Sequence, residues 1–463
     1  MATPLHFVSS KVYPRLTGGR FNTVRVAFVL VTQLIYFGLP WLNWDGQQAT
    51  RFDFDSMRLY LFGLTLLPQD FIYLAAALIV AALGLFLWTM LAGRLWCGFS
   101  CPQTVYTEIM IWIERWVEGP PNQRRKRDAA PWGAEKVLRK STTQLLMAAF
   151  SLWTGLTLVG YFTPMRELAA NLGAGDIGVW EALFALSYGG FTWLLAGHLR
   201  EQVCKHMCPY ARFQGAMFDR DTLLVAYDDK RGEPRGARRK QHAIIPIAAA
   251  NVGRDDKPQG ACVDCGLCVQ VCPTGIDIRE GLQYECIGCA ACIDVCDEVM
   301  DKTGQARGLI RFSTQHAMAQ QQPLPSLRQR PRALVYGGLL LGIVALSATG
   351  LALRVPFKVD ILRDRAVMQR ESNDGYIENV YNVRIMNTER DSRRYRLQVE
   401  SAGLVRVEAP ILQVAGDSVS SFNVALVADP AVLPSGSHTV GVRIVNLDDP
   451  SQVLHEEARL LMP

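Results

Sequence analysis

The sequence lacks several features of common redox proteins. It has no C-x-x-C-H motif, which excludes covalently attached c-type haem. No G-x-G-x-x-G motif follows a predicted strand, so no dinucleotide site of that kind supplies electrons. None of its twelve cysteines is scattered as in a disulfide framework. They fall into four groups: Cys97/Cys101, Cys204/Cys208, Cys262/Cys265/Cys268/Cys272 and Cys286/Cys289/Cys292/Cys296. Such close spacing predicts metal ligation in a reducing compartment.

Charge is scarce in five long apolar stretches, and 49% of the 463 residues are hydrophobic. Each stretch approaches the roughly 20 residues that a membrane-spanning helix needs. They cover 24–42, 71–92, 143–162, 179–199 and 334–353. The first stretch has no clear cleavage site and is predicted to be a permanent span rather than a signal peptide. The sequence therefore predicts a multi-pass membrane protein with soluble parts.

The net charge of +5 does not indicate nucleic-acid binding, because the basic residues cluster beside the apolar stretches. Lys11, Arg15 and Arg20 precede the first stretch, and 124–127 is entirely basic. The loop at 163–178 has Arg166 as its only basic residue. The positive-inside rule then places the N-terminus and the cysteine-rich region at 200–333 in the cytoplasm. Five crossings leave the C-terminus outside.

The residues after 355 have no cysteine and alternate polar with apolar side chains. Short alternating runs include Tyr395/Leu397/Val399 and Val440/Val442/Ile444. They predict an all-β sandwich of immunoglobulin type without its disulfide. The predicted organisation is a cytoplasmic N-terminus at 1–23, four spans at 24–199, a cytoplasmic segment at 200–256, a two-cluster ferredoxin-like α+β domain with linker at 257–333, a fifth span at 334–354 and the sandwich at 355–463.

Eight cysteines lie between 262 and 296, in two copies of C-x2-C-x2-C-x3-C. This spacing is typical of bacterial two-cluster ferredoxins, in which the fourth cysteine of each run ligates the other cluster. The predicted ligands of one 4Fe-4S cluster are Cys262, Cys265, Cys268 and Cys296, and those of the second are Cys286, Cys289, Cys292 and Cys272. A pair of structural zinc sites is the alternative.

The other four cysteines form two C-x3-C-P motifs, each at the end of an even-numbered span. The proline suits the first position of a following helix. If the two span pairs are a duplicated hairpin, Cys97, Cys101, Cys204 and Cys208 converge at the inner membrane face. Such thiolates could favour Cu(I) over Cu(II), hold a third iron-sulfur cluster or form redox disulfides. Plain packing is the remaining alternative. His206, Met207 and His198 are possible additional ligands of this site.

The chain resembles the CcoG/FixG family of cytochrome c oxidase accessory proteins, also called Rdx proteins. The resemblance rests on WCGFSCPQT, CKHMCPYARFQGAMFD, the two ferredoxin runs, the last span and the terminal sandwich, in that order. It implies a bacterial inner-membrane protein that reduces Cu(II) to Cu(I) for assembly of the cbb-type oxidase. It also implies a cytoplasmic copper chaperone, a copper-exporting ATPase and the oxidase assembly machinery as partners, and no nucleic acid.

Two other functions stay open. The first is a quinol-linked electron conduit that handles no copper, for which Gln33 or Glu181 would face a quinol between the spans. The second is a scaffold whose sandwich holds an oxidase subunit. A pure scaffold would not need eight cluster ligands.

Overall fold

The computed structural model describes residues 12–237, 259–320, 323–363, 369–372, 374–400, 405–408 and 411–463. Residues 1–11 and the predicted cytoplasmic segment beyond residue 237 lie outside the described residues. The chain divides into two compact units. Unit 1 comprises Met1–Asp53 and Ala77–Ile343, and unit 2 comprises Phe54–Ala76 and Val344–Pro463. Each is described by itself.

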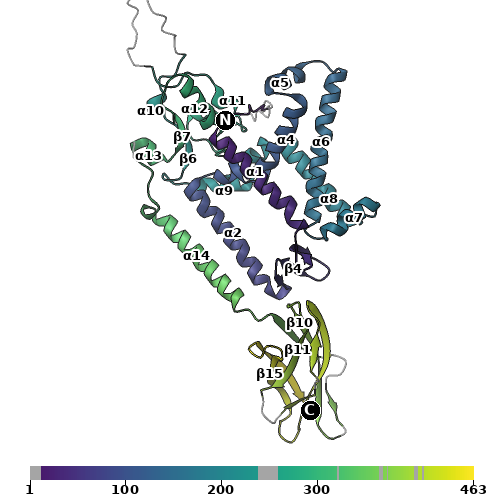
Figure 1. Cartoon of the computed structure of the whole chain (residues 1–463). Helices are drawn as coiled ribbons and strands as arrows, with labels where there is room; N and C mark the ends of the chain where they lie inside the picture. Colours follow the sequence, from purple (N-terminus) through teal and green to yellow (C-terminus); the bar gives the residue numbers. More distant parts are fainter. Residues whose placement is uncertain are drawn as a thin grey trace, which may run out of the picture. The chain divides into compact units, whose positions relative to one another are not determined.

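Five helices of the described residues are long and apolar enough to cross a membrane. They cover Arg20–Trp41, Phe71–Ala92, Ala134–Val159, Val179–Leu199 and Pro331–Ala352. These are α1 (Arg20–Gly38) with a short 3-10 turn, α2 (Phe71–Ala92), α6 (Ala134–Val159), α8 (Val179–Thr192) with the π-helical turn η3 (Trp193–Leu199), and α14 (Pro331–Ala352), as Figure 1 shows. The five predicted apolar stretches are therefore confirmed as helices, with ends shifted by several residues.

Helices α6 and α8 pack closely because small residues meet at their crossing. A Cβ atom at Gly155 would lie 2.1 Å from the carbonyl oxygen of Ala185, and one at Gly189 would lie 2.9 Å from that of Ser151. Small residues at such contacts are typical of helix pairs in membranes, where close backbone approach drives association.

Shorter helices connect the spans of unit 1 (Figure 1). They are α3 (Leu95–Phe99), α4 (Pro102–Glu118), α5 (Pro121–Ala129), α7 (Met165–Ala174), the π-helical turn η4 (Val203–Met207) and α9 (Pro209–Met217). Helix α4 carries its acidic residues Glu108, Glu114 and Glu118 buried, while Trp116 is 81% exposed. This pattern fits a helix that turns its ion pairs toward protein and its tryptophan toward lipid headgroups.

The ferredoxin-like part of unit 1 is small and mixed. Strands β6 (Leu224–Tyr227) and β7 (Ile310–Ser313) pair antiparallel, with Val225 opposite Phe312. The same part contains four helices: α10 (Asp229–Gly232), α11 (Leu267–Gln270), α12 (Ala291–Lys302) and α13 (Gln315–Gln320). The core contains Ile293, Met300 and Leu309 together with cysteines of the motifs.

Unit 2 contains an antiparallel sandwich. One sheet has the order β12-β14-β10-β8, with β9 beside β10, and the other has the order β13-β11-β15-β16. The strands are β8 (Phe357–Arg363), β9 (Arg370–Glu371), β10 (Ile377–Asn387), β11 (Arg393–Val399), β12 (Val405–Glu408), β13 (Leu412–Val414), β14 (Ser418–Ala428), β15 (Gly436–Asn446) and β16 (Val453–Met462). Their alternate side chains form one core that includes Tyr395, Val442 and Ile444. The predicted immunoglobulin-like sandwich is confirmed.

Candidate iron-sulfur and thiol sites

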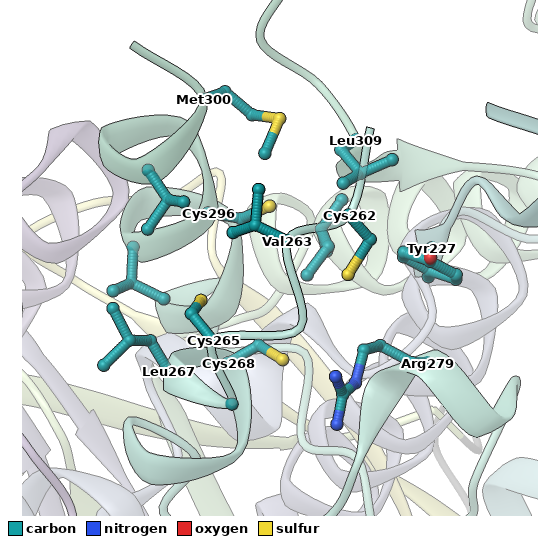
Figure 2. A pocket seen from close by; sticks show the side chains of 14 residues that line it. Tyr227, Cys262, Val263, Cys265, Leu267, Cys268, Arg279, Cys296, Met300 and Leu309 are labelled. Atoms are coloured by element: carbon teal, nitrogen blue, oxygen red, sulfur yellow. The ribbon is translucent and has the colours of Figure 1, made fainter. Parts of the chain in front are cut away.

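The first run of cysteines lines a cavity in the ferredoxin-like part. Cys262, Cys265, Cys268 and Cys296 line it together with Tyr227, Arg279 and Met300, as Figure 2 shows. We call this cavity site one. Cys296 comes from the second run and lies within electrostatic reach of Cys268 and Cys262. The structure thus groups these four cysteines in the crossed pattern that the sequence predicts for one cluster.

The remaining four cysteines of the two runs line a second cavity, which we call site two. It is lined by Cys272, Cys286, Cys289 and Cys292 and also by Cys268, which lines both cavities. The Cys292 thiol lies within electrostatic reach of the other three and of Cys268. The two sites are therefore neighbours.

Both runs have residues with a left-handed backbone conformation at equivalent positions. Asp264 and Gly266 of the first run have φ of 52° and 65°, and Gly288 and Ala290 of the second have 68° and 60°. Such turns aim successive amide N–H groups inward and form a concavity that binds an anionic group. Ala290 is 1% exposed, so here an alanine adopts a conformation usually left to glycine.

The donor set fits a 4Fe-4S cluster at each site. The donors at both sites are cysteine sulfurs in the crossed arrangement of a two-cluster ferredoxin, and they line a cavity. Their role as ligands remains our prediction.

Burial favours the protonated form of three of these thiols when no metal is bound. It raises the pKa of the Cys286 and Cys296 thiols to about 12 and that of Cys292 well above its usual value. Bound metal must therefore ionise these thiols, and its binding releases protons and stabilises the fold.

The two C-x3-C-P motifs meet in unit 1. The Cys204 thiol lies within electrostatic reach of Cys101, Cys97 and Cys208, and we call these four the membrane-edge thiols. Burial raises the pKa of Cys97 to about 11 and of Cys204 to about 12. The duplicated-hairpin hypothesis predicts this proximity, although the thiols do not converge on a single point.

The second cysteine of each pair is the N-cap of a helix that proline opens. Cys101 precedes Pro102 of α4, and Cys208 precedes Pro209 of α9. Burial raises the pKa of the Cys101 thiol, and the nearby backbone N–H groups of Gln103 and Thr104 oppose this shift in part. The positive end of a helix dipole favours a thiolate at this position.

One residue that the sequence does not single out contacts these thiols. Gln214 on α9 is fully buried, and its Nε2 donates to the Cys97 Sγ at 3.3 Å. The hydrogen bond joins the helix after the second motif to the first motif. Lone glutamines carry no spacing signal, so only the fold could reveal it.

The proposed additional ligands His206, Met207 and His198 are exposed in the structure. Met207 is 55% exposed and His206 is also exposed. The His198 Nδ1 lies 3.2 Å from the carbonyl oxygen of Trp193. The structure thus gives these three residues no contact with the membrane-edge thiols among the described interactions.

Of the two side chains considered for a quinol site, Glu181 is hydrogen-bonded, whereas the Gln33 side-chain oxygen has no partner among the described residues. Glu181 accepts from the Gly178 nitrogen and the Thr163 hydroxyl, both at 3.0 Å, and so caps α8. The Oε1 atom of Gln33 is buried without a hydrogen-bond partner in the described structure.

The membrane-edge thiols lie against site two. Cys97 and Cys204 pack against the apolar cluster around Ile287 and Cys289. A Cβ atom at Gly98 would lie 2.8 Å from the backbone of Cys289, so α3 and the loop before α12 are in backbone contact. Sites one and two and the membrane-edge thiols therefore form a continuous series.

The fold and these sites define a membrane-bound iron-sulfur electron-transfer protein. Residues 199–315 match the family described as a 4Fe-4S dicluster domain, and residues 74–120 match a 4Fe-4S binding domain. Residues 347–463 match the IG-like fold at the C-terminal of FixG. The chain belongs to the FixG/Rdx family.

The relatives match over most of their length. Protein RdxA of Cereibacter sphaeroides is 39% identical, covering 87% of this chain and 85% of that protein. Protein RdxB of the same organism is 38% identical, covering 84% and 82%. Nitrogen fixation protein FixG of Rhizobium meliloti is 36% identical, covering 90% and 83%. The predicted family is thereby confirmed.

Proposed function

We propose that this protein is a cupric reductase, which converts Cu(II) to Cu(I) at the membrane-edge thiols for assembly of the cbb-type oxidase copper centre. The observation that carries the proposal is the backbone contact between the first C-x3-C-P motif at Gly98 and site two at Cys289. A cluster at site two would supply single electrons, and the neighbouring membrane-edge thiols would bind the Cu(I) that forms.

The chemistry is a simple electron transfer. When bound, the two 4Fe-4S clusters each take up and release one electron at a time. Each Cu(II) ion takes up one electron and becomes Cu(I). Thiolate sulfur binds Cu(I) more tightly than Cu(II), so Cys97, Cys101, Cys204 and Cys208 favour the reduced product. Gln214 orients Cys97 through its hydrogen bond to the Sγ atom.

The orientation and partners belong to the same proposal. The basic residues of 124–127 and Lys140, at the ends of α5 and α6, favour a cytoplasmic position for both cluster sites, with the sandwich in the periplasm. The inner membrane of a bacterium, a copper chaperone, a copper-exporting ATPase and the oxidase assembly machinery follow as the proposed setting.

A third iron-sulfur cluster on the membrane-edge thiols is the second candidate. It is favoured by the match of residues 74–120, which contain Cys97 and Cys101, to a 4Fe-4S binding domain. Iron and sulfide analysis separates the two candidates. If these thiols hold a third cluster, their four-serine variant loses the iron and sulfide of that cluster. Under the copper proposal its iron content stays unchanged.

The test is single-turnover copper reduction. The full-length protein is purified without oxygen, reduced and mixed with Cu(II), and Cu(I) is trapped by a colorimetric chelator while cluster oxidation is followed optically. We expect one Cu(I) for each electron lost, and a slow reaction in the four-serine variant. His206→Ala is the matched control, since His206 lies beside Cys204 in sequence but is exposed. Clusters that stay reduced in the presence of copper would favour a quinol-linked conduit instead.

A further inference from the structure

Arg94 is a buried cation without a carboxylate partner. It lies two residues after α2, at the N-cap of α3, and is 5% exposed. One guanidinium nitrogen donates to the Tyr284 carbonyl oxygen, and Nη2 donates to that of Ala211 at 2.5 Å. Its Nε has no hydrogen-bond partner, and no ion pair to Arg94 is found among the described residues. Two neutral carbonyls hold the side chain without cancelling its charge.

The charge of Arg94 acts on both site two and the membrane-edge thiols. Cys286 of site two lies within its electrostatic reach, as do Cys97 and Cys204. Arg94 and Cys286 also line one small cavity together. The side chain therefore stands between the two sets of sulfur atoms.

Site one also has an arginine, but carboxylates neutralise it. Arg279 lines site one (Figure 2), where its Nη2 lies 2.6 Å from Asp277 Oδ2 and its Nη1 pairs with Asp264. Asp297 lies within electrostatic reach of Cys296. One cation and three carboxylates thus surround site one.

Two further charges near site two cancel each other. Arg25 and Glu108 both lie within electrostatic reach of Cys289, and they pair with each other at 3.4 Å. Two carboxylates are also close in sequence: Glu285 is exposed beside Cys286, and Asp294 is held by the backbone N–H groups of Phe21 and Asn22. Arg94 is the buried cation within reach of Cys286 for which the described residues provide no carboxylate partner.

An added electron makes an iron-sulfur group more negative, so nearby uncompensated positive charge raises its reduction potential. The effect is strongest in a buried, weakly polarisable environment. Cys265 of site one is exposed, whereas none of the four cysteines of site two is, so a reductant reaches site one first.

We propose that Arg94 makes a cluster bound at site two easier to reduce than a cluster bound at site one. Electrons would then run from the exposed site one to site two and on toward the membrane-edge thiols. One electron leaves site one and one arrives at site two, and a one-electron reductant on the exposed side replaces the first. The destination rests on the proposed function, whereas the order of the two potentials does not.

The experiment is a redox titration of the full-length, cluster-loaded protein in detergent, followed by electron paramagnetic resonance without copper. We expect two resolved potentials, the higher of which shifts downward in Arg94→Gln and stays close to the wild-type value in Arg94→Lys. Arg279→Gln is the matched control, and it should lower only the lower potential. If Arg94→Gln keeps both clusters and both potentials unchanged, or shifts only the lower potential, the proposal is overturned.

A second measurement does not depend on the stability of an Arg94 variant. Wild-type protein that has received one electron should show the signal of site two, which Cys265→Ser leaves unchanged. If this first signal is instead the one that Cys265→Ser alters, site one is reduced first and the proposal is wrong. This measurement contains no copper, so a wrong order of the two potentials would not contradict the cupric reductase proposal. Likewise, a failure of copper reduction would not contradict the order of the potentials.

Discussion

The carboxylate of Asp294 accepts a hydrogen bond of 2.7 Å from the backbone nitrogen of Asn22. Asp294 lies on α12 between two cluster cysteines, and Asn22 lies in the first turn of α1. A second bond of 3.2 Å comes from the Phe21 nitrogen. The N-cap position, Gly19, has no side chain, so a residue of the ferredoxin-like part caps the first span.

Replacing Asp294 by alanine should loosen this junction. The change removes two hydrogen bonds to free N–H groups, and losses of a helix cap typically cost about 1 kcal/mol. We expect a lower unfolding temperature of the cluster-loaded protein and faster amide exchange in the first turn of α1. Asp301→Ala is the control, because Asp301 lies on the same helix in an exposed pair with Arg307. Equal exchange in both variants would contradict the capping role.

Glu114 should be among the least replaceable residues of the membrane region. It binds both Arg124 and Arg200, the latter through two contacts of 2.5 and 3.0 Å, and all three side chains are buried. Glu114→Gln leaves two buried cations unpaired, which costs roughly 3 to 5 kcal/mol. Arg200 has a left-handed φ of 37° just before the second motif, so the change should also displace Cys204.

Thermal unfolding and copper reduction measure the two effects of Glu114→Gln. Glu135→Gln is the control, since Glu135 forms an exposed pair with Arg139 that contributes little. A Glu114→Gln protein with wild-type stability and copper reduction would show that the cluster of charges does not position the second motif.

Unit 2 has a comparable buried ion pair. Asp70 is 2% exposed, lies 2.7 Å from Arg354 through its Oδ2, and accepts from the Leu67 nitrogen before α2. Asp70→Asn leaves Arg354 buried with less compensation, which costs about 3 kcal/mol. We expect faster hydrogen exchange at the start of α2 and β8. The exposed Asp374 provides the control, and Asp374→Asn should leave exchange unchanged.

Patterns that repeat along the chain were predictable, and contacts between single residues were not. Alternation in Val440/Val442/Ile444 predicts one buried face because strand side chains alternate, and all three are buried. The cysteine spacing likewise predicts the grouping of sulfurs. By contrast, the basic run at 124–127 indicates only a cytoplasmic loop, yet Arg124 is 2% exposed in the ion cluster of Glu114.

The partners of single buried polar residues could be identified only from the three-dimensional structure. Arg25 stands near the end of the first predicted span, but in the structure it lies inside α1 and is buried against Glu108. The Arg25–Glu108 and Arg200–Glu114 pairs each join residues more than 80 positions apart in sequence, and no local propensity encodes such partners. Asp294, Arg94 and Gln214 have no motif of their own, so each gains a role only from its neighbours.

Gln214 provides the sharpest test of the membrane-edge thiols. Its hydrogen bond fixes Cys97, and outer partners of metal ligands typically contribute about 10- to 100-fold in affinity or activity. We expect Gln214→Leu to weaken Cu(I) binding by about 10-fold or more, measured by competition with a chelator, and to slow copper reduction while the cluster spectra stay unchanged.

The control for Gln214→Leu is Gln103→Leu. Gln103 is half-buried at the start of α4, and its Nε2 donates to the Leu195 carbonyl oxygen at 2.9 Å rather than to a thiol. Its loss removes a helix contact of similar size without touching Cys97. If both variants weaken Cu(I) binding equally, the effect is general loosening of the fold. A selective loss in Gln214→Leu requires that Cys97 itself binds copper, since the hydrogen bond reaches no other sulfur among the described contacts.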